Sequence, residues 1–406
     1  MKLRLKTNGL MLSAFSLGFA AIAGLLTQWA NAADAAGQKP PQLIPQAGTN
    51  LSLRHEVQHA IDQGNAWFEK SQNTNGWWST PEHPAVTALV LTAFRLQAET
   101  REKKAESSAV TKGYAFVLSC VQPDGGIYRK ELPSYNTSLS LTALVLANRP
   151  AYRSTIAKAR KFIIGLQTVA DESGKSDDPF VGGIGYGKQD KRPDLSNTSL
   201  ALEALYLSRQ INPPETITPP SEDLNWKAAI HFIQCCQNLP SHNSAVWASD
   251  DPQNKGGFVY SPDKSMAGET NLPSGRVALR SYGSMSYAGL LSYIYADLNR
   301  DDPRVIAVLD WLRANFTIDE NPALGAQGLY YYYHTMAKPL SIYGADRLQT
   351  ADGRSINWRE QLALKLINLQ HADGSWANEN GRWWEKDPAL VTAYSLIALD
   401  MIQKKL

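Results

Sequence analysis

The 406-residue sequence has little cysteine: only Cys120, Cys235 and Cys236 are present. Three cysteines cannot build a disulfide framework, and none of them has the spacing to other cysteines or histidines that zinc sites show. We therefore expect neither a disulfide scaffold nor a bound metal ion, and no motif indicates a cofactor.

A block of basic residues is also missing. Lysine and arginine number 40 against 38 aspartates and glutamates, which gives a net charge of +2. A protein that binds nucleic acid needs a concentrated basic face that displaces counterions from the phosphates. We therefore expect no nucleic-acid partner.

Beyond its first 32 residues the chain has no apolar run of the roughly 18 residues that a membrane-spanning helix needs. The first 32 residues differ. Lys2, Arg4 and Lys6 precede an apolar run over residues 10–26, and Ala30-Asn31-Ala32 forms a cleavage site. This pattern predicts a signal peptide over residues 1–32 and export to the periplasm or the extracellular space. The alternative is an uncleaved N-terminal anchor.

Residues 33–50 are rich in alanine, glutamine, proline and glycine, which predicts a disordered lead-in. The whole chain is 43 % apolar and 19 % charged, a composition typical of a folded protein with a sizeable core. We assign residues 51–406 to a single domain, because one repeat runs through all of it.

The repeat is a glutamine followed by a glycine and an aromatic residue, as in Gln370, Gly374 and Trp376. Two other copies have the same spacing, two are stretched by insertions, and the long gap before Gln370 holds a divergent copy. These copies are Gln72-Gly76-Trp78, Gln122-Gly126-Tyr128, Gln167 with "GGIGY" at 182–186, Gln237 with "GGFVY" at 256–260, and Asn315 with "QGLYYYY" at 327–333.

Each copy has an apolar-periodic helix before the glutamine, a glycine-rich turn, and a second apolar helix after it. Six copies predict twelve helices. Asn136 and Asn197 stand where N-caps of the second helices are expected. The glutamine amide is best explained as a partner for free backbone groups at helix ends, and the aromatic ring as a cover over the turn.

The Q-x-x-x-G-x-W spacing on helical hairpins resembles the repeat of squalene cyclases, oxidosqualene cyclases and protein prenyltransferase β subunits, from about residue 52 to 404. This resemblance implies an all-α fold, an (α/α)6 toroid of six helical hairpins with a central cavity. Cys120 and Cys235 lie two residues before their glutamines in non-adjacent repeats, so we expect buried free thiols.

The resemblance implies two activities, and the sequence departs from both. Squalene cyclases protonate an alkene with a D-x-D-D motif, which is absent; the adjacent acids Asp301 and Asp302 precede a proline, as at a helix start. Prenyltransferases hold zinc with Asp, Cys and His. "YYHTMA" around His334 matches the histidine motif, but Arg280 and Tyr282 stand where the Asp and Cys would be. The thioester motif of complement-type toroids is absent as well.

The start of the second helix of each repeat would line the mouth of the cavity. Threonines stand there in four repeats, at Thr87, Thr137, Thr198 and Thr392. Repeats four and five depart from this pattern, and repeat six has the segment "RWWEKDP" before its helix. These three repeats gather basic, aromatic, imidazole and acidic groups, as a small-molecule site requires. These groups are Arg280, Tyr282 and Ser284, then Tyr330–Tyr333, His334 and Thr335, then Arg382, Trp383, Trp384, Glu385 and Asp387.

We predict that the cavity binds or transforms an apolar, possibly isoprenoid, small molecule. His334 or Glu385 would donate or accept a proton, and Arg280 would hold an anionic group. The predicted ligand contacts are Arg280, Tyr282, Tyr332, Tyr333, Trp383, Trp384 and Asp387. Structural alternatives are that Asp387 caps the last helix, that His334 is a core residue, and that the tyrosines pack in the wall.

Two other functions remain open. In a carbohydrate-active toroid, Trp383 and Trp384 would stack on sugars, and paired carboxylates such as Glu385, Asp387 and Asp194 would face each other. Asp250 and Asp251, which follow Trp247 in an insertion, fit an ordinary solvated loop. A non-catalytic interaction module would have an occluded cavity and a binding surface on its outer helices or loops. The sequence identifies neither a substrate, a protein partner nor an oligomeric state.

Overall fold

The structure is a computed structural model that describes residues 50–98, 106–169, 178–187, 190–209 and 223–406. The signal peptide predicted for residues 1–32 and all but the last residue of the lead-in lie outside these ranges. Asn50, which the sequence places in the lead-in, belongs to the folded domain: its Oδ1 accepts a hydrogen bond from Leu53 N and caps helix α2. None of the helices in the described ranges is long and apolar enough to cross a bilayer.

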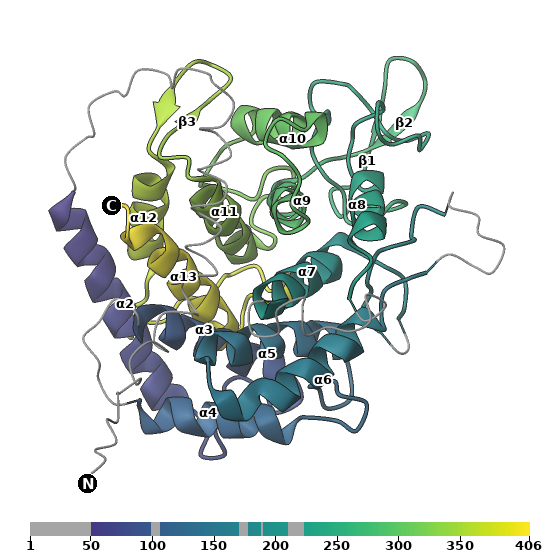
Figure 1. Ribbon diagram of the computed structural model, residues 1–406. Coiled ribbons are helices and arrows are strands. Elements are labelled where there is room, and N and C mark those ends of the chain that lie inside the picture. Colours follow the sequence, from purple (N-terminus) through teal and green to yellow (C-terminus); the bar gives the residue numbers. More distant parts are fainter. Residues whose placement is uncertain (1–49, 99–105, 170–177, 188–189, 210–222) are drawn as a thin grey trace, which may run out of the picture.

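Twelve α-helices alternate between an outer and an inner ring in the described part of the chain, which confirms the predicted number (Figure 1). The outer helices are α2 (Leu51–Ser71), α4 (Ser108–Ser119), α6 (Arg153–Ile164), α8 (Trp226–Cys235), α10 (Pro303–Ala314) and α12 (Trp358–Leu369). The inner helices are α3 (Pro84–Ala98), α5 (Pro133–Ala147), α7 (Leu195–Arg209), α9 (Gly283–Tyr295), α11 (Leu329–Tyr343) and α13 (Pro388–Gln403). Each inner helix packs against the next, and α13 packs against α3, so the ring is closed.

Burial patterns explain which helices are inside. In α5 every residue from 136 to 146 is buried, because the helix has neighbours on all sides. In α6 the buried residues are Ile156, Ala159, Arg160 and Ile163, a spacing of three to four that covers one face. Helix α5 is therefore buried on all sides, whereas α6 is amphipathic.

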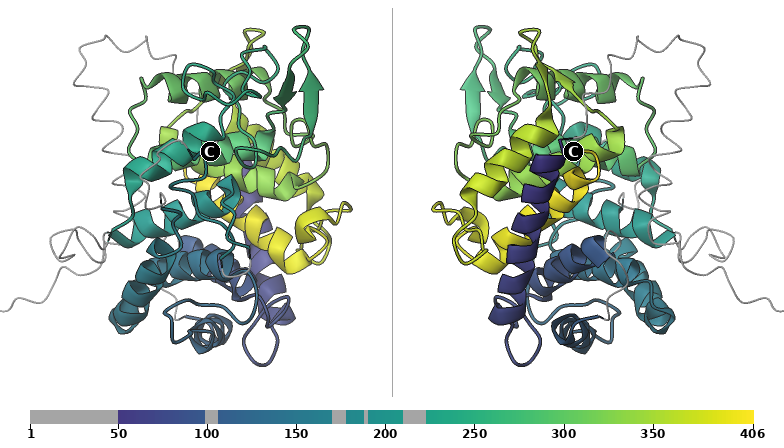
Figure 2. Two further views of the ribbon diagram at one scale, coloured as in Figure 1. Left: turned by 90° about the vertical axis from the view of Figure 1, so that its right-hand side faces the viewer. Right: turned by 90° about the vertical axis from the view of Figure 1, so that its left-hand side faces the viewer.

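Short non-α elements complete the fold. Strand β1 (Glu269–Asn271) pairs antiparallel with β2 (Val277–Leu279), with Glu269 opposite Leu279, and β3 (Leu348–Gln349) pairs with β4 (Ser355–Ile356). The side views in Figure 2 show the β1–β2 hairpin projecting beyond the neighbouring helices. Two 3₁₀ turns, η1 (Pro150–Tyr152) and η4 (Arg382–Trp384), precede α6 and α13.

The repeated glutamine links consecutive outer helices, which confirms its structural role. Gln370 Nε2 donates to Gly374 O in its own turn and to Ala60 O of α2, each at 2.9 Å. Gln72, Gln167 and Gln237 donate in the same way to Ala109 O in α4, Asn225 O before α8 and Arg304 O in α10. Gln122 stays within its own turn, donating to Tyr128 O.

The glycine of each turn lies directly against the next outer helix. At Gly76, Gly125, Gly182, Gly256 and Gly374, φ lies between +89° and +94°. A Cβ at any of these would lie 1.9–2.7 Å from a backbone oxygen of that helix. No other residue type fits there, because the position needs both a left-handed φ and no side chain.

These glycines correct the register of the second repeat. The left-handed glycine there is Gly125, not Gly126, so Val121 rather than Gln122 takes the place of Gln72. Cys120 is then the equivalent of Cys236, not of Cys235. All three cysteines are free and buried, as predicted.

The threonines of the second helices are also turn residues, which corrects their predicted place at the cavity mouth. Thr87 and Thr392 accept hydrogen bonds from the backbone N–H groups of Trp78 and Trp376. Thr137 and Thr198 accept from Ile127 and Ile184, so isoleucines, not tyrosines, follow the glycine in these two repeats. All four threonines are fully buried.

The predicted N-caps Asn136 and Asn197 lie inside their helices, because proline and leucine begin α5 and α7 earlier. Asn136 Oδ1 instead accepts from Ala85 N and caps the neighbouring inner helix α3. The cap predicted before residue 303 is confirmed: Asp302 accepts from Arg304 N at the start of α10.

A buried ion pair crosses the inside of the ring. Lys338 Nζ of α11 lies 2.9 and 2.8 Å from the two carboxylate oxygens of Glu203 in α7. These helices are separated by α9 in the ring, so the pair joins two helices that are not neighbours. Breaking a pair of this kind leaves a buried charge without compensation.

Candidate functional site

A cavity of about 270 Å³ lies at the N-terminal ends of the inner helices. All six inner helices contribute side chains to it: Val86 of α3, Tyr135 of α5, Ser196 and Leu200 of α7, Ser284 and Met285 of α9, Tyr331 of α11, and Leu390 and Tyr394 of α13. Connecting segments supply the rest: Leu132, Tyr186, Tyr260, Met266, Tyr282, Trp383, Trp384 and Glu385.

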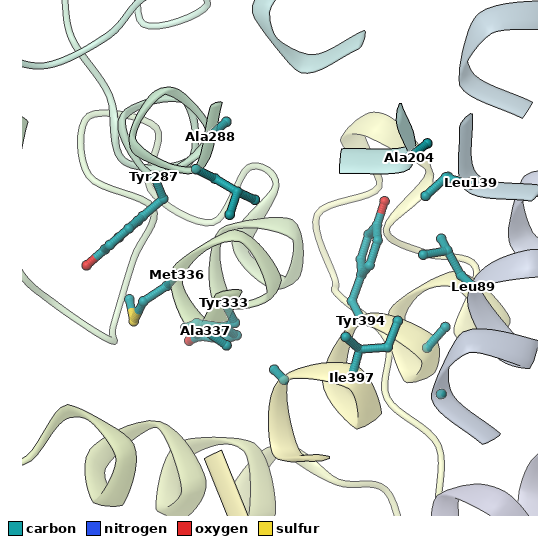
Figure 3. Close-up of a cluster of buried hydrophobic side chains, with 14 of the residues drawn as sticks. Leu89, Leu139, Ala204, Tyr287, Ala288, Tyr333, Met336, Ala337, Tyr394 and Ile397 are labelled. Carbon is teal, nitrogen blue, oxygen red and sulfur yellow. The ribbon is translucent and has the colours of Figure 1, made fainter. Parts of the chain in front are cut away.

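The lining is aromatic and almost uncharged. Six tyrosines and two tryptophans surround the space, Glu385 is the one acidic residue among the described lining residues, and no lysine, arginine or histidine occurs among them. Figure 3 shows Tyr394 pointing from α13 toward Leu139 of α5 and Ala204 of α7. Burial raises the pKa of Tyr135 to about 12, although a hydrogen bond with Tyr394 acts to lower it.

Side chains and loop residues cap the helix ends that face the cavity. A helix N-terminus has free N–H groups and carries about half a positive charge. Glu385 caps α11, accepting from Tyr331 N at 2.7 Å and from Tyr330 N at 3.3 Å. Asp194 caps α7, with Oδ1 accepting from Asn197 N at 2.9 Å. The three remaining acceptors of this kind are Asp387 on α13, Asn136 on α3 and Asn321 on α9.

Burial raises the pKa of the two carboxyl groups nearest the cavity. For Glu385, which is 1 % exposed, desolvation outweighs the hydrogen bonds from Asn378 and the α11 backbone that lower its pKa. For Asp194, 2 % exposed, burial raises the pKa to about 6 despite the hydrogen bonds from Asn197, Ser196 and Tyr260. Both groups therefore bind protons more readily than an exposed carboxylate does.

Trp383 and Trp384 lie at the opening of the cavity in a strained segment. Both have a left-handed backbone, with φ of 55° and 66°, which costs about 1–2 kcal/mol at each non-glycine residue. Their side chains are 42 % and 48 % exposed. The indole of Trp384 contacts the ring of His83 at 4.5 Å, and Arg382 stacks on Trp383.

Four of the predicted site residues line the cavity: Tyr282, Trp383, Trp384 and Glu385. Asp387 lies beside it and caps α13, accepting from Ala389 N and from the hydroxyl of Ser79. The structural explanation of Asp387-Pro388 as a helix start is therefore confirmed.

The other predicted site residues lie away from the lining. Tyr332 and Tyr333 are buried in the wall, where their hydroxyls donate to Thr317 O at 2.7 Å and Ile318 O at 2.6 Å. Tyr331, which the prediction passed over, faces the cavity. The alternation of these tyrosines around the helix was recognised from sequence, but the phase of α11 decides which of them points inward.

His334 and Arg280 do not converge with Glu385 at the cavity. His334 is 2 % exposed and its ring lies 4.8 Å from that of Tyr394. Burial and then Lys338 lower its pKa well below the usual range, so the imidazole is neutral. Arg280 lies between β2 and α9, where its guanidinium donates to Ala267 O at 3.4 Å. His334 is therefore placed as a core residue.

Sequence reasoning missed Tyr135, Tyr186, Tyr260 and Tyr394 as site residues. Tyr186 and Tyr260 end the "GGIGY" and "GGFVY" turns and look like the aromatic residue of the repeat. The available signal was the spacing. Tyr186 and Tyr260 follow the turn glycines Gly182 and Gly256 by four residues, whereas Trp78 and Trp376 follow their glycines by two. Tyr135 and Tyr394 stand among apolar helix residues and carry no local signal.

A second hollow lies on the outer ring between α2 and the turn after α12. Its lining includes His55, His59, Gln63 and His371. His59 shares a hydrogen bond with Gln63 at 2.9 Å. Among the residues that the structure describes, no group of three or more His, Cys, Asp or Glu side chains is placed to hold a metal ion.

Two known structures are similar to this chain at low sequence identity. A variant of the type II terpene cyclase MstE from Scytonema, in complex with geranylgeranyl dihydroxybenzoate, is 13 % identical, with a TM-score of 0.48, over 88 % of this chain and 100 % of that chain. Candida albicans protein geranylgeranyltransferase-I complexed with GGPP is also 13 % identical, with a TM-score of 0.49, over 85 % and 92 %. No protein-family model and no curated protein matches the sequence. At this level of likeness, the function has to come from the side chains of this chain.

Proposed function

We propose that the central cavity binds a small, uncharged and mainly apolar molecule, of which a short isoprenoid is one example. The observation that carries this proposal is the lining itself: eight aromatic rings with valine, leucine and methionine side chains around about 270 Å³. This volume is near the lower end of ligand sites, which hold roughly 300–1,000 Å³.

The charge pattern around the cavity supports an uncharged ligand. An anion such as a diphosphate needs lysine or arginine donors, and the described lining residues include neither. The helix N-termini, which attract anions when free, are already occupied by Glu385, Asp194 and Asp387.

If the protein transforms its ligand, Glu385 is the proton donor or acceptor that the geometry favours. It is the acidic residue of the described lining, and burial raises its pKa toward the working range of an acid–base catalyst. His334, the other predicted candidate, is separated from the cavity by its burial against Tyr394. Export, predicted from residues 1–32, remains part of the proposal.

The two alternatives have less support. A glycoside-cleaving site needs two carboxyl groups across the substrate, whereas Asp194 and Asp387 cap helices and only Glu385 belongs to the described lining. An interaction module would have a filled centre, whereas this cavity opens beside the exposed Trp383 and Trp384.

Binding of naphthalene and of naphthalene-1-sulfonate, two fluorescent probes of the same shape, tests the proposal. We expect naphthalene to bind at least about tenfold more tightly, because the sulfonate brings a charge with no counter-charge. Leu200→Trp, which fills the cavity, should abolish naphthalene binding. Leu364→Trp, on the 43 % exposed Leu364 of α12, is the matched control and should not. Equal binding of both probes, or binding that survives Leu200→Trp, would contradict the proposal.

A further inference from the structure

One wall of the cavity gathers four phenols around a buried carboxyl group. Tyr260 donates a hydrogen bond to Asp194, and Tyr186 is hydrogen-bonded to Tyr260 and to Asn197. The carboxyl group of Asp194 acts electrostatically on all four tyrosines, raising the pKa of each. All four line the cavity: Tyr186, Tyr260, Tyr282 and Tyr331.

Two of these phenols have hydrogen-bonding capacity to spare. The hydroxyls of Tyr186 and Tyr260 belong to the network around Asp194. For Tyr282 and Tyr331, in contrast, the structure shows no hydrogen bond of the hydroxyl to any described residue, although each ring lies in the cavity wall. Both rings line the same cavity of about 270 Å³.

Two neighbouring tyrosines of α11 show how a phenol that does not line the cavity is hydrogen-bonded in this wall. Tyr332 and Tyr333 donate their hydroxyl protons to backbone carbonyls at 2.7 and 2.6 Å. Buried polar groups are nearly always paired in this way. The hydroxyls of Tyr282 and Tyr331 have no such protein partner among the described residues, so they are available to a polar atom of the molecule that fills the cavity.

We infer that the ligand carries an uncharged oxygen group, a hydroxyl or a carbonyl, which is held by the hydroxyls of Tyr282 and Tyr331. This inference rests on the proposed function, because it concerns the same cavity. A phenol can donate to either oxygen and can accept from a hydroxyl. Asp194 acts as a positioning residue, since it fixes Tyr260 and, through it, Tyr186 beside the pair.

Comparing naphthalene with 1-naphthol tests this inference, because the two probes differ by one hydroxyl. Naphthalene is the more apolar probe, so burial alone favours it. We expect 1-naphthol to bind at least about tenfold more tightly, the effect of one to two hydrogen bonds in a dry site. Tyr331→Phe and Tyr282→Phe should each reduce the ratio of 1-naphthol affinity to naphthalene affinity several-fold, because each removes one hydroxyl donor from the cavity wall.

The control is Tyr332→Phe, the same change at the next residue of α11, whose hydroxyl serves Thr317 O. It should leave the preference for 1-naphthol unchanged even if it lowers stability. Equal affinities of the two probes for the unaltered protein would overturn the inference. A preference for 1-naphthol that survives both Tyr282→Phe and Tyr331→Phe would overturn it as well. Either result would leave the proposed function standing. Failure of both probes to bind would overturn the proposed function.

Discussion

Two tryptophans eight residues apart, Trp376 and Trp384, show the contrast between the repeated turn and the cavity mouth. Trp376 is fully buried, its indole donates to Leu366 O at 2.7 Å, and its backbone N–H donates to Thr392. Trp384 is 48 % exposed and has a strained, left-handed backbone. Trp376 therefore meets the local requirements of the fold, whereas Trp384 departs from them. Functional sites are expected at residues that depart from these requirements.

The same contrast holds for the acidic residues of the two regions. Asp302, at an outer helix, forms an ion pair with Arg304 at 2.7 Å, and this partner holds its pKa below the usual range. Asp194, beside the cavity, accepts hydrogen bonds from the neutral residues Asn197, Ser196 and Tyr260, and burial raises its pKa to about 6. The two aspartates therefore shift in opposite directions: hydrogen bonding to Arg304 lowers the pKa of Asp302, whereas burial raises the pKa of Asp194.

The largest expected effect separates the two tryptophans. Trp376→Ala should lower the free energy of unfolding by about 3–5 kcal/mol, because it leaves a cavity and an unpaired Leu366 carbonyl. Trp384→Ala should change it by no more than about 1 kcal/mol, since the side chain is half exposed and alanine keeps the same left-handed backbone. Urea denaturation of both variants measures the difference. Similar losses in the two would erase the distinction between turn and mouth.

A smaller effect is expected from glycines that share a left-handed backbone. Gly182→Ala should cost about 3 kcal/mol, from strain at φ +91° and a Cβ only 1.9 Å from Ala228 O. Gly275→Ala, at φ +79° with nothing within 4 Å, isolates the strain and should cost about 1 kcal/mol. Thermal and urea denaturation give both values. A Gly182→Ala variant no less stable than Gly275→Ala would show that helix contact is unimportant in the turn.

The pH dependence of stability should distinguish the two aspartates. The pKa of Asp194 rises from 3.8 to about 6 on folding, so the folded state binds the proton more tightly. Its contribution is fully present below pH 3.8 and is lost as the pH rises to about 6, a change of up to about 3 kcal/mol. Asp194→Asn should remove this slope.

Asp302→Asn is the control, and its slope has the opposite sign. The pKa of Asp302 is lowered on folding, so its contribution is present above the unfolded pKa and is lost as the pH falls. Denaturation midpoints between about pH 2 and pH 7 compare each variant with the unaltered protein. A slope of the same sign for both aspartates would contradict the contrast between ring and cavity.

The smallest expected effect concerns the cavity opening. Replacing Trp383 and Trp384 together by asparagine, which tolerates a left-handed backbone, should leave stability within about 1 kcal/mol and speed the release of naphthalene several-fold. Stopped-flow fluorescence measures release. Trp67→Asn, on the outer helix α2, provides a comparison far from the opening. Release rates that match in both variants would show that the two tryptophans do not restrict the opening.

Much of the fold could be predicted because its signals are local and repeated. Gln370 and Gly374 lie four residues apart and act together in one turn, so each copy of the turn is readable on its own. The wrong register at Gln122 arose because Gln122, Gly126 and Tyr128 have the sequence spacing of the repeat, although the left-handed glycine of the turn is Gly125. Glu385 was recognised as a site residue since it departs from the other copies.

The sequence by itself determined six hairpins, twelve helices and the buried turns, because periodic burial and a tight glycine are set by residues close along the chain. Only the tertiary structure decided which side chains meet at the centre. Tyr331, rather than Tyr332, faces the cavity because Glu385, more than fifty residues away, anchors the first turn of α11. Tyr135, Tyr186 and Tyr260 meet there because closing the ring brings three separate repeats to one wall, a condition that no stretch of sequence contains.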